Sequence, residues 1–128
     1  MAPIRVLLVD DSLEFLEAVA RFLSSDKMID LIGTTHSGRE VLRKVPDVKP
    51  DLILLDIAMP DISGLELTRQ IKAQPDAPMV ILLTLYDNSE YRSAAGAVLA
   101  DGFISKSELG EQLLPLIHSL SYHQAPGD

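Results

Sequence analysis

The chain has 128 residues and a formal net charge of −8, from 11 basic and 19 acidic side chains. A chain of this length is expected to form one domain whose hydrophobic core is large enough to fold without disulfides or a structural metal. The absence of cysteine excludes disulfides, thiolate zinc sites and cysteine nucleophiles. The acidic balance argues against direct nucleic-acid contact, and no apolar stretch approaches the roughly 20 residues of a membrane helix. No signal peptide opens the sequence, so the default expectation is a cytoplasmic domain without membrane contact.

Short apolar runs alternate with amphipathic stretches along the chain. The apolar runs predict strands at Ile4–Val9, Met28–Thr34, Leu52–Leu55, Met79–Leu83 and Gly102–Ser105. The amphipathic stretches predict helices over Leu13–Ser24, from Ser37 to about Val45, from Ser63 to about Ala73, from Asp87 to about Val98, and over Ser107–Leu120. In the last helix, Pro115 predicts a kink or a restart because proline removes one backbone N–H group.

This order of a strand followed by a helix, five times, predicts an α/β fold of the flavodoxin-like (βα)5 class. We expect a doubly wound, parallel five-stranded sheet with strand order 2-1-3-4-5. Continuous apolar strands fit such a sheet, because both of its faces are covered by helices. The domain is expected to span residues 1–122, and residues 123–128 to form a tail or the start of a linker.

Polar residues follow four of the five predicted strands. Asp10 and Asp11 follow the first, Asp56 the third, Thr84 the fourth and Lys106 the fifth. Parallel strands end at one edge of the sheet, so these side chains are expected together. Carboxylates that repel one another stay ionised when a cation joins them, and Mg²⁺ prefers such oxygen ligands. An aspartate beside Mg²⁺ is a candidate phosphoryl acceptor, with the lysine and the hydroxyl facing the phosphoryl oxygens.

Two alternative assignments, another acceptor and a purely structural role for the first two acids, fit the sequence less well. Asp51 is a rival acceptor on the third strand, but it precedes Asp56 by about 16 Å of extended chain, which places it at the opposite edge of the sheet. The Asp10–Asp11 pair resembles a helix cap, but Ser12 already supplies a capping hydroxyl. The metal and acceptor roles are therefore the favoured hypotheses.

Taken together, these motifs resemble the receiver domain of bacterial two-component response regulators. The matching pieces are Val9-Asp10-Asp11-Ser12, Leu55-Asp56-Ile57-Ala58-Met59-Pro60 followed by Gly64, Leu83-Thr84, and Gly102-Phe103-Ile104-Ser105-Lys106. The resemblance covers about residues 3–121. The segments Thr84-Leu-Tyr-Asp-Asn and Phe-Ile-Ser-Lys-Ser are most similar to receivers that precede a helix-turn-helix DNA-binding domain.

The resemblance implies a phosphoryl site. Asp56 would accept a phosphoryl group from a sensor histidine kinase or a phosphotransfer protein. Mg²⁺ would be held by Asp10, Asp11, Asp56 and the backbone carbonyl of Ala58, and Lys106 would pair with the phosphoryl group.

The resemblance also implies a switch and an output. Thr84 would hydrogen-bond the phosphoryl group, and Phe103 would turn inward after it. The altered surface would be the face formed by the helix to about Val98, the strand Gly102–Ser105 and the last helix. The implied partners are a C-terminal DNA-binding domain outside this chain and, in some receivers, a second copy of the same domain.

Other function classes fit the residues less well. A degenerate receiver, which binds partners without phosphorylation, stays an alternative because Leu85 replaces the small residue that usually follows the threonine. A phosphatase needs a second acid where Ala58 stands. A flavin module needs a phosphate-binding loop after the first strand, where Asp10 and Asp11 would repel phosphate. We therefore expect a regulatory phosphoacceptor domain and not a turnover enzyme.

Overall fold

The computed structural model describes residues 2–86 and 88–123. Five parallel strands form one sheet in the order β2-β1-β3-β4-β5, so the predicted flavodoxin-like topology is confirmed. The strands are β1 (Ile4–Val9), β2 (Ile29–Thr35), β3 (Leu52–Asp56), β4 (Met79–Thr84) and β5 (Gly102–Ser105). The helices are α1 (Leu13–Ser24), α2 (Gly38–Val48), α3 (Gly64–Lys72), α4 (Ser89–Ala97) and α5 (Leu109–His123), and the 3-10 turn η1 (Lys106–Glu108) precedes α5.

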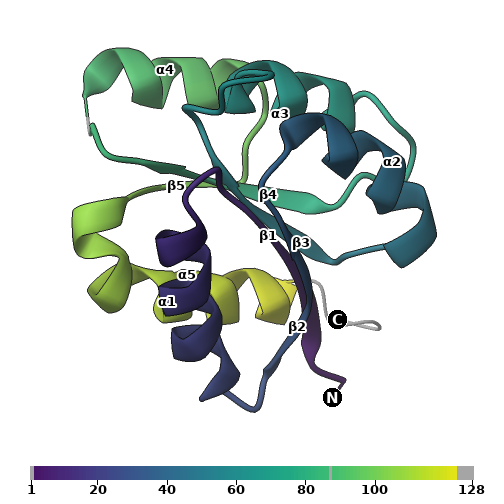
Figure 1. Ribbon diagram of the computed structural model, residues 1–128, viewed down its shortest axis with the longest axis vertical. Helices are drawn as coiled ribbons and strands as arrows, with labels where there is room; N and C mark the ends of the chain where they lie inside the picture. Colours follow the sequence, from purple (N-terminus) through teal and green to yellow (C-terminus); the bar gives the residue numbers. More distant parts are fainter. Residues whose placement is uncertain (1, 87, 124–128) are drawn as a thin grey trace.

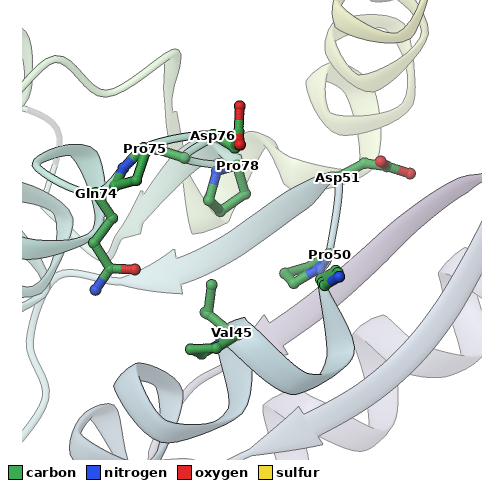
Figure 2. A pocket seen from close by; sticks show the side chains of 10 residues that line it. Val45, Pro50, Asp51, Gln74, Pro75, Asp76 and Pro78 are labelled. Carbon is green, nitrogen blue, oxygen red and sulfur yellow. The ribbon is translucent and has the colours of Figure 1, made fainter.

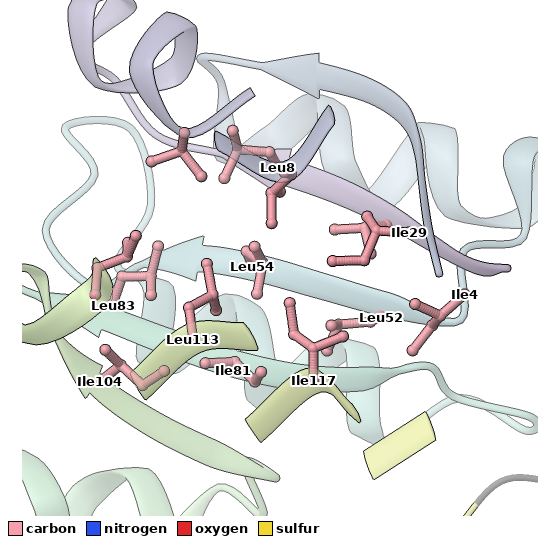
Figure 3. Packing of buried hydrophobic residues seen from close by; sticks show 14 of the residues in the cluster. Ile4, Leu8, Ile29, Leu52, Leu54, Ile81, Leu83, Ile104, Leu113 and Ile117 are labelled. Carbon is pink, nitrogen blue, oxygen red and sulfur yellow. The ribbon is translucent and has the colours of Figure 1, made fainter. Parts of the chain in front are cut away.

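Helices cover both faces of the sheet. Figure 1 shows α1 and α5 on one side and α2, α3 and α4 on the other. Along β3, Leu52 and Leu54 belong to the α1–α5 side of the core, whereas Ile53 and Leu55 belong to the other side. Figure 3 shows Leu54 in the first of these clusters, together with residues of α5. This double coverage explains why the strands are continuous apolar runs.

Two helices each contain a proline and continue through it. The predicted end of α2 near Val45 is wrong, because the helix continues through Pro46 to Val48. Val45 is buried, and Lys49 closes the helix in a left-handed conformation (φ 48°) with its N–H donating to the Val45 carbonyl. The last helix does not restart at Pro115: α5 runs through this residue without a break. Both prolines are exposed, so the carbonyl that each leaves unpaired is close to water.

The last helix extends beyond the predicted end at Leu120 and includes the first residue of the predicted tail. His123 is the final residue of α5, so it belongs to the helix, and the rest of the predicted tail, 124–128, lies outside the described residues. Within the described part of the chain, no helix has both the length and the apolar character that a bilayer crossing requires.

The edge at the amino ends of β3 and β4 carries a hollow of about 630 Å³ (Figure 2). Four prolines line it together with Lys49 and Asp51; they are Pro46, Pro50, Pro75 and Pro78. Asp51 accepts a hydrogen bond from the backbone N–H of Arg5 at 2.8 Å. The rival acceptor therefore lies at the opposite edge of the sheet from Asp56, as predicted.

Two glycines of the helices have very different surroundings. A Cβ atom at Gly64 would lie 2.3 Å from the backbone oxygen of Asp56, whereas at Gly96 nothing lies within 4 Å. We expect Gly64→Ala to lower the free energy of unfolding by about 1–3 kcal/mol, because the backbone must move. Gly96→Ala should raise it by up to about 1 kcal/mol, because alanine favours the helix. Urea-induced unfolding of both variants measures the difference, and equal effects would contradict a close approach at Gly64.

Candidate functional site

Three carboxylates meet at the carboxyl edge of the sheet, where β1 and β3 lie side by side. Asp10 follows β1 and Asp56 ends β3, and the residues just before them, Val9 and Leu55, are register partners. A carboxylate oxygen from each of Asp10, Asp11 and Asp56 lies within 4.8 Å of the other two. Asp10 and Asp56 are buried and Asp11 is exposed. The predicted acidic cluster is therefore present, and the sheet topology assembles it.

Backbone hydrogen bonds fix the loop that follows β1. The backbone N–H of Asp10 donates to the carbonyl of Thr35 at the end of β2, at 3.2 Å. Oδ1 of Asp10 accepts from the N–H of Ser12 at 2.9 Å. The hydroxyl of Ser12 then accepts from the N–H of Phe15 at 3.2 Å and caps α1. The start of α1 is thus tied directly to one of the buried acids.

The loop after β3 is held equally closely. The N–H of Ala58 donates to Oδ1 of Asp56 at 3.3 Å, which places the exposed Ala58 backbone next to the acceptor. The N–H of Gly64 donates to the carbonyl of Ile57 at 2.8 Å and closes the loop. Because α3 begins at Gly64, where a side chain would strike the Asp56 backbone, the first turn of that helix lies against the acceptor strand.

Lys106 brings a positive charge to the acids from the end of β5. Its Nζ lies 2.6 Å from Oδ2 of Asp10 and 3.6 Å from Oδ1 of Asp56. Its side chain is only 11 % exposed. With all three acids ionised, three carboxylates and one ammonium leave two negative charges unbalanced at this edge. A divalent cation would balance them, and carboxylate oxygens are the ligands that Mg²⁺ prefers, so the residues present fit that ion.

The surroundings of Asp56 raise the pKa of its carboxyl above the ordinary range. Burial is the largest cause, followed by repulsion from the Asp10 carboxylate, and Asp11 adds to it. The Lys106 ammonium and the hydrogen bond from Ala58 oppose this shift without cancelling it. The carboxylate form of Asp56 is therefore held at a cost that added positive charge would relieve.

The two predicted switch residues lie at neighbouring strand ends. Thr84 is buried, and its hydroxyl donates to the carbonyl of Tyr86 at 3.1 Å and accepts from the N–H of Tyr86 at 3.0 Å. Phe103 is half-buried against the α2–α3–α4 side of the core. The Arg92 guanidinium of α4 lies 4.9 Å from the centre of the Phe103 ring. Thr84 and Phe103 therefore lie on the adjacent strands β4 and β5, beside the start of α4.

Sequence reasoning missed Asp61, which ties the loop after Asp56 to α2. Its Oδ2 accepts from the Ser37 hydroxyl at 2.9 Å and from the Arg39 N–H at 3.1 Å, and its Oδ1 accepts from the Gly38 N–H at 3.3 Å. These groups belong to the cap and first turn of α2. Because Ser37 and Glu40 already form a local capping pattern, no sequence signal indicates this distant partner.

A family model described as the response regulator receiver domain matches residues 6–118. The chain is a response regulator receiver domain. The receiver domain is similar to the response regulator protein VraR of Staphylococcus saprophyticus, with 38 % identity over 82 % of this chain and 50 % of that protein. It is 34 % identical to the transcriptional regulatory protein YdfI of Bacillus subtilis, over 85 % of this chain and 51 % of that protein.

One relative carries the name of an enzyme. The receiver domain is 36 % identical to a protein-glutamate methylesterase/protein-glutamine glutaminase of Nocardioides sp., over 94 % of this chain but only 36 % of that protein. The receiver domain thus spans about half, or less, of the length of these curated relatives. The family itself is regulatory, whatever the rest of such a protein does.

Solved structures agree on the fold. The receiver domain superposes on the signal receiver domain of the putative response regulator NarL from Mycobacterium tuberculosis with a TM-score of 0.89, at 23 % identity, covering 97 % of this chain and 100 % of that one. For the response regulator domain of Thermotoga maritima CheB, the TM-score is 0.83 at 26 % identity, covering 91 % of this chain and 95 % of that one. Both agree with the observed strand order.

The raised pKa of Asp56 predicts a pH-dependent penalty on folding. A carboxyl whose pKa is higher in the folded state contributes stability below its unfolded pKa and loses it as the pH rises through the folded pKa. Asp56→Asn removes that loss, so without divalent cations we expect the variant to be more stable than the wild type at about pH 7. The gap should close near the ordinary aspartate pKa of about 4. Urea titrations with a chelator at both pH values measure it, and a less stable variant at the higher pH would contradict the prediction.

Proposed function

We propose that this receiver domain takes a phosphoryl group onto Asp56 with Mg²⁺ and thereby changes its α4–β5–α5 surface. The observation that carries the proposal is the edge at which Asp10, Asp11 and Asp56 converge on a single ammonium from Lys106. Such an edge has an acceptor oxygen, metal ligands and a cation for the phosphoryl oxygens. Phosphoryl transfer depends chiefly on positioning and charge neutralisation, which these groups supply.

The proposed transfer uses groups already in place. A carboxylate oxygen of Asp56 forms a bond to phosphorus while the P–N bond of a phosphohistidine breaks, and the imidazole nitrogen keeps the electron pair. Asp10, Asp11, Asp56 and the Ala58 carbonyl would hold Mg²⁺, which supplies positive charge beside the phosphoryl oxygens. Lys106, already between two carboxylates, pairs with the phosphoryl group from the other side. The domain acts once per phosphoryl group and is regulatory, not a turnover enzyme.

Thr84 is the proposed link between the phosphoryl group and the surface. Its hydroxyl proton is engaged by the Tyr86 carbonyl, so Thr84 must break this turn to donate to a phosphoryl oxygen. Leu85 and Tyr86 are both exposed and lie between β4 and α4. A rearrangement there alters the start of α4 and the space beside Phe103, which is stacked under Arg92. The phosphoryl group thus biases a pre-existing equilibrium of this region.

The relatives suggest the partners. VraR is named a response regulator protein and YdfI a transcriptional regulatory protein, and this chain covers about half of each. We propose that a sensor histidine kinase or phosphotransfer protein supplies the phosphoryl group in the cytoplasm. A C-terminal DNA-binding domain and a homodimer formed on phosphorylation are the proposed outputs. In this arrangement the acidic receiver itself does not touch DNA.

Labelling with a small donor tests the acceptor. After incubation with acetyl phosphate and Mg²⁺, intact mass should show a single phosphoryl adduct on the wild type and none on Asp56→Asn. Asp51→Asn is the matched control at the other end of the same strand region, and it should be labelled like the wild type. Adduct on Asp56→Asn would refute the assignment. No adduct on the wild type, even with a purified kinase, would favour the degenerate alternative.

Removal of the exposed acid tests the metal site. We expect Mg²⁺ to raise the melting temperature of the wild type, because a ligand at 100 times its Kd stabilises the folded state by about 2.7 kcal/mol. Asp11→Ala should lose most of this increase, since it removes one of three clustered carboxylates. Glu14→Ala removes an acid from the first turn of α1 and should keep the increase. An undiminished Mg²⁺ response in Asp11→Ala would place the metal elsewhere.

A further inference from the structure

Phe15 lies against the ammonium group of the proposed phosphoryl site. The Nζ atom of Lys106 is 4.2 Å from the centre of the Phe15 ring. Phe15 is half-buried and packs against the α1–α5 side of the core, so its ring is held in place. An aromatic face attracts a cation but offers no strong hydrogen-bond acceptor, so the three N–H groups of the lysine stay available for oxygen atoms.

The same two residues belong to a closed circuit of contacts. Lys106 Nζ contacts Oδ2 of Asp10 at 2.6 Å, and Oδ1 of that carboxylate accepts from the N–H of Ser12 at 2.9 Å. The Ser12 hydroxyl accepts from the N–H of Phe15 at 3.2 Å, and the Phe15 ring returns to Lys106. The circuit thus joins a buried acid of the site to the first turn of α1.

We propose that Phe15 is a positioning residue for Lys106: its ring confines the ammonium to the side facing Asp10 and Asp56, where the phosphoryl group arrives. This inference rests on the proposed function. A lysine side chain has four rotatable carbon bonds, and with a small aliphatic neighbour it would leave the site in a larger share of its conformations. The ring also covers part of a side chain that is only 11 % exposed, and exclusion of water strengthens the attraction of its ammonium to oxygen anions.

The chain contains a matched control for loss of an aromatic ring. Phe22 lies on the same helix and is half-buried against the same core cluster. The ammonium of Lys106 lies beside the first turn of α1, in contact with the Phe15 ring. Phe15→Leu and Phe22→Leu therefore remove the same atoms from the same helix and core, and only the first removes the ring beside the ammonium.

The test combines a spectroscopic and a kinetic measurement on the full chain. By NMR, the Lys106 side-chain protons of the wild type should show an upfield ring-current shift that Phe15→Leu abolishes and Phe22→Leu keeps. In Mg²⁺ and acetyl phosphate, Phe15→Leu should slow phosphorylation of Asp56 by about five- to thirty-fold, the range that a partly desolvated cation–π contact supports. Phe15→Tyr keeps the ring face and should stay within about two-fold of the wild type.

Three results would overturn the inference. The first is equal phosphorylation rates in Phe15→Leu and Phe22→Leu, and the second is a Lys106 ring-current shift that survives Phe15→Leu. The third is a Phe15→Tyr variant as slow as Phe15→Leu, which would show that packing alone matters. Lack of labelling of the wild type would overturn the proposed function instead, and the NMR comparison would then still decide whether Phe15 places Lys106.

Discussion

Lys106 lies 2.6 Å from Oδ2 of Asp10 and 3.6 Å from Oδ1 of Asp56, and its charge allows two buried carboxylates to stand beside each other. Oxygen atoms of these carboxylates lie within 4.8 Å of each other, and like charges this close repel strongly where water is excluded. One ammonium cannot balance three acids. Burial, with added repulsion from Asp10 and Asp11, raises the pKa of Asp56 despite the Lys106 charge. The edge is therefore prepared for additional positive charge and for a reaction that needs it. The proposed Mg²⁺ ion would relieve this imbalance, and the proposed phosphoryl transfer would depend on the positive charge that the ion adds.

A rigid sheet maintains this unfavourable arrangement. The strands β1, β3 and β4 are almost wholly buried and are covered by helices on both faces, so burial of apolar surface offsets the cost of the acidic edge. Short loops with several backbone hydrogen bonds then hold the acids close together. Asp61 and Gly64 fix the loop after the acceptor, while Ser12 and Phe15 fix the loop after β1. The packed core and these loops thus prevent the three carboxylates from moving apart to relieve their repulsion.

The proposed output region around α4 is, in contrast to the sheet, loosely packed and largely exposed. Only Ala95 of α4 is buried, and exposed Leu85 and Tyr86 precede this helix. Leu99, also exposed, takes a left-handed conformation (φ 66°) just after the other end of α4. Elements that bury little apolar surface open at low free energy, which suits a region that must change with phosphorylation. Thr84 links this loosely packed region to the rigid edge through its turn with Tyr86.

The sequence by itself determined the layout: five apolar strands alternating with five helices require a parallel, doubly wound sheet, and strand ends in such a sheet share an edge. The sequence alone therefore places Asp10, Asp11, Asp56, Thr84 and Lys106 at that edge. The sequence did not indicate that the second helix continues through Pro46 to Val48, or that the last helix runs through Pro115 without a restart, because both prolines are exposed and tolerated there. Only the tertiary structure revealed Phe15 against Lys106 and Asp61 on α2. Such contacts join residues distant in the chain, and side-chain packing, unlike strand order, has no periodic signal in sequence.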